Sequence, residues 1–184
     1  ADMAALPWEF LFDERRREYL CLSKDTLPIR YLELPQPILP LTVSQPLRVL
    51  GMVASPADRD KLDQDRERQR IEAAVKHLRD SGVLELEWLP GQSWRHLQRA
   101  MRHGPWHILH FIGHGGFDSS CDEGCIALVN DSGQQELLRA SQLARLLAGH
   151  HSLRRVLLNA CEGGKGSGQD IFSSSAAILV HSGI

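Results

Sequence analysis

The amino-acid sequence predicts an α/β fold, a three-layer sandwich in which helices flank both faces of a mostly parallel central sheet. Short apolar segments alternate along the chain with longer segments whose apolar residues recur at helical spacing. The predicted strands are apolar throughout, which is typical of strands buried on both faces of a parallel sheet. With 184 residues, the chain is long enough to bury a hydrophobic core.

The first 46 residues are expected to form an N-terminal hairpin and a proline-rich connection. Residues 6–13 and residues 29–34 are the stretches expected to pair as hairpin strands. Four prolines lie from Pro35 to Pro46, and because proline has no N–H for a ladder, this stretch is a connection. Residues 47–184 then form the α/β core of a single domain that covers residues 1–184.

The core elements follow from apolar periodicity and from the residues that begin or end helices. In the first predicted helix Ile71, Val75 and Leu78 share one face, and Gly82 can end it. Ser93 can cap the second. Short apolar runs predict strands at 47–54, 83–89, 106–112, 125–129 and 155–160. Helical spacing predicts helices at 62–81, 93–101, 141–148 and 170 to about 181, the last after a glycine-rich loop at 163–168.

Charge and hydropathy argue against several classes of protein. The formal net charge is −2, which gives no electrostatic reason to expect nucleic acid or an anionic membrane as a partner. No apolar run approaches the roughly 20 residues that span a bilayer, and the start of the chain shows no signal peptide. We therefore expect a cytoplasmic protein that binds neither nucleic acid nor membrane.

The four cysteines, Cys21, Cys121, Cys125 and Cys161, are too sparse for a secreted disulfide scaffold. Cys121 and Cys125 have C-x-x-x-C spacing, but no further ligands follow at zinc-finger spacing. We therefore expect two ordinary thiols there and no metal site. Reduced thiols suit the cytoplasm, and no motif indicates an organic cofactor.

Two motifs place reactive side chains at the ends of predicted strands. The strand that runs out at Ile112 is followed by His114, which has glycines at positions 113, 115 and 116 around it. The strand at 155–160 is followed by Cys161 and then by a glycine-rich loop. If these strands are neighbours in a parallel sheet, their carboxyl ends share one edge, and His114 and Cys161 face one crevice.

A cysteine beside a histidine is the arrangement that a thiol nucleophile needs. Free cysteine has a pKa of about 8.5, so an imidazole must take its proton or stabilise the thiolate at neutral pH. The same imidazole can later protonate a leaving amine. The N–H groups of Gly115 and Cys161 are the natural donors to a developing oxyanion. Alone, Cys161 would more often be a core residue. The two motifs together favour catalysis.

These motifs resemble those of the CHAT domain, a branch of the caspase and separase clan of cysteine peptidases. The similarity covers most of the chain. It includes Leu-Pro-Trp-Glu at 6–9, His-Phe-Ile-Gly-His-Gly at 110–115 and Leu-Asn-Ala-Cys-Glu at 158–162. The resemblance implies a caspase-like sandwich and a cysteine endopeptidase whose dyad is His114 and Cys161, with Gly115 as an oxyanion donor.

Three neighbouring residues have weaker assignments. Asn159 stands where caspases have a glutamine that touches the substrate, so it is expected either to bind substrate in the first specificity pocket or to anchor the loop. His110 is expected to be a core histidine. Asp118 follows the histidine motif and could orient His114, although the clan works mostly with a dyad.

The expected partner is a protein or peptide substrate in a regulatory, defence or cell-death pathway. The family's domain continues past the position of Ile184 into another strand and helix, and members are often fused to sensor modules. The resemblance therefore implies that a further C-terminal segment or a regulatory sensor domain completes the enzyme. The alternative is a catalytically silent caspase-like interaction domain. A nucleotide-binding module is disfavoured because residues 113–116 lack G-x-G-x-x-G spacing.

Overall fold

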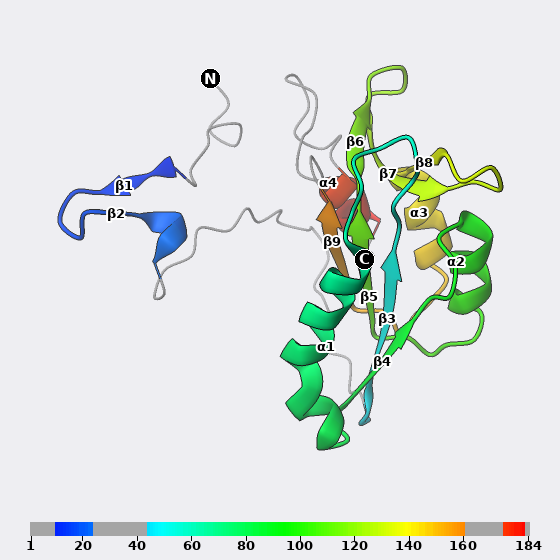
Figure 1. The fold of residues 1–184 in the computed structure, drawn as a ribbon, viewed down its shortest axis with the longest axis horizontal. Coiled ribbons are helices and arrows are strands. Elements are labelled where there is room, and N and C mark those ends of the chain that lie inside the picture. Colours follow the sequence, from blue (N-terminus) through cyan, green and yellow to red (C-terminus); the bar gives the residue numbers. More distant parts are fainter. Residues whose placement is uncertain (1–9, 24–43, 161–174, 183–184) are drawn as a thin grey trace. The chain divides into compact units, whose positions relative to one another are not determined.

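The computed structural model describes residues 10–23, 44–160 and 175–182, which are drawn as coloured ribbon in Figure 1. The chain divides into two units, residues 1–35 and residues 36–184. Within the described ranges, no helix combines the length and the apolarity needed to cross a bilayer.

The N-terminal unit contains an antiparallel hairpin, as predicted, but the two strands that pair in it are not residues 6–13 and 29–34. Strand β1 (Phe12–Asp13) pairs antiparallel with β2 (Glu18–Tyr19), and a short 3-10 turn, η3 (Leu20–Leu22), follows. The rings of Phe12 and Tyr19 meet edge to face with their centroids 5.2 Å apart. The predicted partner strand, residues 29–34, lies outside the described residues.

The larger unit is built on a four-stranded parallel sheet with the order β4-β3-β5-β9. This confirms the predicted mostly parallel α/β fold, and each of the four strands lies within one residue or two of its predicted range. Their bounds are β3 (Leu47–Val53), β4 (Leu84–Trp88), β5 (Ile108–Gly113) and β9 (Arg155–Ala160).

Helices cover both faces of this sheet (Figure 1). On one face, Leu50, Met52 and Phe111 are almost fully buried in a core that also takes in residues of α2 (Trp94–Met101), α3 (Ala140–Leu147) and α4 (Ser175–His181). On the other face lies α1 (Gln64–Asp80), whose Glu72 carboxylate accepts a hydrogen bond of 2.9 Å from Trp88 Nε1.

The two faces are packed unequally. Helices α2 and α3 bury apolar residues completely, Leu97, Met101, Leu143 and Leu147 among them. Helix α1 has no fully buried residue, and its inward side is only half-buried, at Ile71 and Val75. Because burial of apolar area is the main stabilising term, the face that carries α2 and α3 holds most of the hydrophobic stabilisation.

The predicted strand 125–129 belongs to a different sheet from the one expected. It is β7 (Glu123–Val129), the middle strand of a three-stranded antiparallel sheet with β6 (Gly115–Asp118) and β8 (Gln135–Arg139). Neither outer strand has an apolar run, since β6 begins with two glycines and β8 is mostly polar and exposed. Their pairing with the buried β7 makes them strands.

Candidate active site

Strand β5 ends directly before His114, and its neighbour β9 ends directly before position 161 in the sequence. These strands are parallel neighbours, and their register pairs Gly113 with Ala160. His114 is the next residue after Gly113, and Cys161 is the next after Ala160. Cys161 itself lies outside the described residues. The neighbouring strands on which the sequence prediction depended are therefore present, in register to their last residue.

Gly113 ends β5 in a place where only glycine fits. A Cβ atom there would lie 2.7 Å from Cζ of Phe111 and 2.9 Å from the carbonyl oxygen of Ala54. The Ala54 N–H donates a hydrogen bond of 2.9 Å to the Ile112 carbonyl, which continues the β3–β5 pairing past the end of β3. The backbone directly before His114 is therefore packed closely against Phe111 and the main chain of Ala54.

The His114 side chain is oriented by a main-chain carbonyl from a loop far away in sequence. Its Nε2 lies 2.8 Å from the carbonyl oxygen of Asp60. Since a carbonyl oxygen can only accept, Nε2 carries a proton in this bond, which leaves Nδ1 of the neutral ring as an unprotonated acceptor. A histidine in this tautomer can take a proton at Nδ1 and give it back.

The loop that supplies this carbonyl joins β3 to α1 and is anchored to the turn between β7 and β8. The Asp58 carboxylate accepts a hydrogen bond of 2.8 Å from the Gln135 N–H, and Arg59 Nε donates one of 2.8 Å to Gln135 Oε1. The Ala57 N–H donates to the Gly133 carbonyl at 2.9 Å. Three hydrogen bonds therefore connect the loop to this turn and to the first residue of β8.

A second set of hydrogen bonds holds the same loop from inside. The Ser55 N–H donates to Gln92 Oε1 at 2.8 Å, and the Leu62 N–H donates to the Ser55 hydroxyl at 3.2 Å. Gln92 Nε2 in turn donates to Gln64 Oε1, at 3.2 Å, in the first turn of α1. None of these residues could be identified from the sequence, since they are scattered over the chain and have no motif.

Gly115 lies at the start of β6, and the register determines where its N–H points. It is paired with Ile126, and the Ala127 N–H donates a hydrogen bond of 2.9 Å to the His114 carbonyl. In an antiparallel ladder this makes Gly115 a non-hydrogen-bonded position, so its N–H lies on the side of β6 away from β7. That N–H is therefore not used in the β6–β7 ladder.

Asn159 and Asp118 have different surroundings from each other. Asn159 is exposed, on the same face of β9 as Leu157 and one residue from its end. Asp118 does not orient His114, because its carboxylate accepts hydrogen bonds from the Ser120 hydroxyl and N–H and lies 3.7 Å from Arg139 Nη2. The hydrogen bond from Ser120 lowers the pKa of the Asp118 carboxyl.

His110, Cys121 and Cys125 are all at least half-buried. His110 lies in the middle of β5, half-buried, and burial lowers its imidazole pKa. Cys125 is buried in β7 and Cys121 lies in the turn before it, and burial raises the pKa of both thiols. Among the residues that the structure describes, no three His, Cys, Asp or Glu side chains are grouped so as to hold a metal ion.

Comparison with known proteins identifies the family. A search among curated proteins found no match. The family model of the CHAT domain, which is related to the caspase-like cysteine peptidases, matches residues 1–184. That match covers the chain from end to end, and it agrees with the parallel sheet whose β5 and β9 end in register before His114 and Cys161. The chain therefore belongs to the CHAT domain family.

Proposed function

We propose that this chain is a cysteine endopeptidase with Cys161 as its nucleophile and His114 as its general base and acid. The observation that carries the proposal is the register of β5 and β9, in which Gly113 and Ala160 are partners. Residue 161 follows Ala160 directly, so its Cα atom lies about 3.8 Å from that of Ala160. Membership of the CHAT family supports the same chemistry.

The state of His114 suits the proposed first step. With Nε2 donating to the Asp60 carbonyl, the lone pair of Nδ1 is free to take the proton of the Cys161 thiol. The thiolate sulfur then attacks the carbonyl carbon of the scissile peptide bond, and the carbonyl π electrons move onto the oxygen. A donor that is already aligned stabilises this oxyanion best, and the Gly115 N–H, unused in the β6–β7 ladder, is our proposed donor with the Cys161 N–H.

The second half of the reaction regenerates the enzyme. Protonated His114 gives its proton to the leaving amine as the C–N bond breaks, which leaves a thioester on Cys161. Water then attacks the thioester carbonyl while His114 takes a proton from it, and the carboxylic acid departs as the thiol reforms. The Asp60 carbonyl can keep its hydrogen bond to Nε2 throughout, because Nε2 is protonated in both forms of the ring.

Substrate contacts and setting are also part of the proposal. Asn159 is exposed at the carboxyl end of β9, where it can contact a substrate side chain. The substrate would be a protein or peptide, and a regulatory sensor domain or a further segment of chain would control access to the cleft. We propose the cytoplasm as the compartment, since the nucleophile must be a reduced cysteine and the cytoplasm keeps thiols reduced.

The test is turnover of a panel of fluorogenic peptides that differ at the cleavage-site residue, by the full-length protein. We expect turnover in the parent and its loss in Cys161→Ala and His114→Ala. Cys21→Ser and His151→Gln are the matched controls, because they change an exposed cysteine and an exposed histidine elsewhere. Equal cleavage by the parent and both dyad variants would rule out the mechanism. Absence of turnover under every condition would favour the catalytically silent interaction domain.

A further inference from the structure

Among the described residues, the outer edge of β8 has one outward main-chain N–H without a partner, that of Leu137. Three hydrogen bonds around β7 and β8 define which residues point outward. The Asn130 N–H donates to the Gln134 carbonyl, whereas the N–H groups of Gln135 and Arg139 donate to side chains, Asp58 Oδ1 at 2.8 Å and Gln142 Oε1 at 3.1 Å.

The alternation of an antiparallel ladder assigns the remaining groups. Since Gln135 and Arg139 point their N–H groups away from β7, Leu137 between them does the same, and only Glu136 and Leu138 bond to β7. The Ala127 N–H agrees with this, because it donates to His114 on the far side of β7. The N–H and C=O of Leu137 therefore both face outward, and within the described residues no group meets its N–H.

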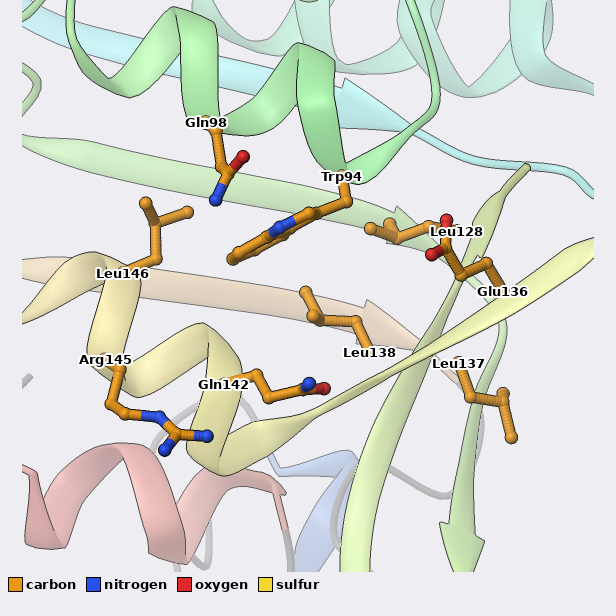
Figure 2. Close-up of a pocket in the computed structure, with 9 residues that line it drawn as sticks. All are labelled: Trp94, Gln98, Leu128, Glu136, Leu137, Leu138, Gln142, Arg145 and Leu146. Carbon is orange, nitrogen blue, oxygen red and sulfur yellow. The ribbon is translucent and has the colours of Figure 1, made fainter. Parts of the chain in front are cut away.

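This open position lines a cavity. A pocket of about 420 Å³ lies between α2, α3 and β8, and Leu137 is one of its lining residues. Its floor is apolar, and Figure 2 shows Trp94, Leu138 and Leu146 pointing toward one another across it. Trp94 and Leu146 are only half-buried, so apolar surface remains available to a side chain that enters.

The two ends of the pocket carry opposite charges. Glu136 and Arg145 lie at its opposite ends in Figure 2, and both side chains are exposed. In the part of the chain that the structure describes, neither the Glu136 carboxylate nor the Arg145 guanidinium has an ionic partner. Natural sheet edges are usually protected, and here Asp58 and Gln142 protect both sides of Leu137 but leave Leu137 itself open.

We infer that this edge binds an extended segment of a partner protein, which pairs with Leu137 as an added strand. The paired residue of the segment would exchange two hydrogen bonds with the N–H and C=O of Leu137. Its neighbour in the segment would then point to the same side as Leu138, so that an apolar side chain there enters the pocket over Trp94. An acidic residue of the segment would meet Arg145 and a basic one Glu136.

The inference does not depend on the proposed peptidase activity, because the edge includes neither His114 nor Cys161. The partner chemistry follows from the surface itself. A pocket with an apolar floor beside one open pair of main-chain groups suits an extended peptide, and the unpaired charges at its two ends select a segment with opposite charges on either side of the apolar residue.

The experiment selects ligands for the full chain from a displayed library of random linear peptides and then titrates the selected peptides. We expect enrichment of an apolar residue flanked by an acidic residue on one side and a basic residue on the other. Leu137→Pro removes the outward N–H and replaces the side chain; an edge strand tolerates proline, and the variant should weaken binding about tenfold. Leu137→Val keeps the N–H and should bind within about twofold of the parent.

Two further readings distinguish the proposed edge from other surfaces. Arg145→Gln should weaken binding about threefold, and more so at low salt. Amide hydrogen exchange should be fast at Leu137 in the free protein and slow once a selected peptide is bound. Thermal melts of Leu137→Pro check that the variant is folded.

Several outcomes would overturn the inference. One is that no peptide is enriched, and another is that the selected peptides bind folded Leu137→Pro and Arg145→Gln as tightly as the parent. Protection of the Leu137 amide that grows with protein concentration and without peptide would assign the edge to a second copy of this chain, and would also refute a separate partner.

Discussion

Replacement of Gly113 by alanine tests the packing that holds the end of β5 in front of His114. The new Cβ would lie 2.7 Å from Phe111 Cζ and 2.9 Å from the Ala54 carbonyl oxygen. Both distances are shorter than real Cβ contacts, and neither neighbour can easily move, since Phe111 is 1% exposed and Ala54 is fully buried. Overpacking of this kind destabilises a protein by about 1–3 kcal/mol.

The expected shift is large enough to measure by calorimetry. In a chain of this size, each kcal/mol lowers Tm by about 2–4 °C, so Gly113→Ala should lower Tm by about 2–12 °C. The same change should reduce peptide hydrolysis if His114 is the base, because the backbone before it must shift. Urea unfolding at neutral pH gives the change in free energy of unfolding independently of the thermal scan.

Gly116→Ala is the matched control, three residues along the same chain. Among the described residues, its Cβ would meet only Cys125 Sγ, at 3.6 Å, which is an ordinary contact. Because alanine restricts the unfolded chain more than glycine does, this variant should be unchanged or more stable by about 0.4–1 kcal/mol. Equal effects of the two substitutions would refute our account of why glycine is needed at position 113.

Two further predictions concern burial and loop anchoring. Burial lowers the pKa of His110, and burial together with Arg48 lowers that of His107, so in the folded state both stay neutral where the unfolded chain already binds protons. The free energy of unfolding should therefore fall as pH drops below about 6.5. His110→Leu should make this fall smaller when the free energy is measured by urea titration between neutral and acidic pH. An unchanged dependence of the free energy on pH in this variant would contradict the idea. Asp58→Ala removes the acceptor of the Gln135 N–H and should cost about 1 kcal/mol of stability, whereas Asp58→Asn keeps an acceptor and should cost less. If the anchored loop positions His114, Asp58→Ala should also shift the pH profile of peptide hydrolysis, and a loss of stability with an unaltered profile would limit the anchor to a structural role.

Much of the fold could be predicted from local patterns. The inner strands β3 and β5 are short, mostly apolar runs, and they were predicted because burial on both faces favours apolar residues at nearly every position. Strands β4 and β9, at the two ends of the strand order, alternate between more buried and exposed positions. The antiparallel sheet could not be predicted in the same way. Strand β6 begins with glycines and β8 is polar, so both depend on pairing with β7, which no local window contains.

Part of the candidate site could likewise be predicted from local sequence patterns, and part could not. His114 and Cys161 were predicted from the sequence because each follows a strand in a short motif with glycines nearby. The carbonyl of Asp60 could not be, since every residue has a main-chain carbonyl and this one lies 54 positions before the histidine it contacts. Its anchors, Gln92 and Gln135, are likewise polar residues without a motif.

By itself, the sequence determined that the four strands of the parallel sheet exist and that His114 and Cys161 each follow one of them, but it did not separate residues 125–129 from that sheet. Apolar burial and strand ends are local properties, and they can be read one segment at a time. Only the tertiary structure decided that Gly113 and Ala160 are partners, that Asp60 orients His114, and that Leu137 has an open edge. Those features depend on register and on hydrogen bonds to main-chain groups of distant segments, and every residue type has such main-chain groups.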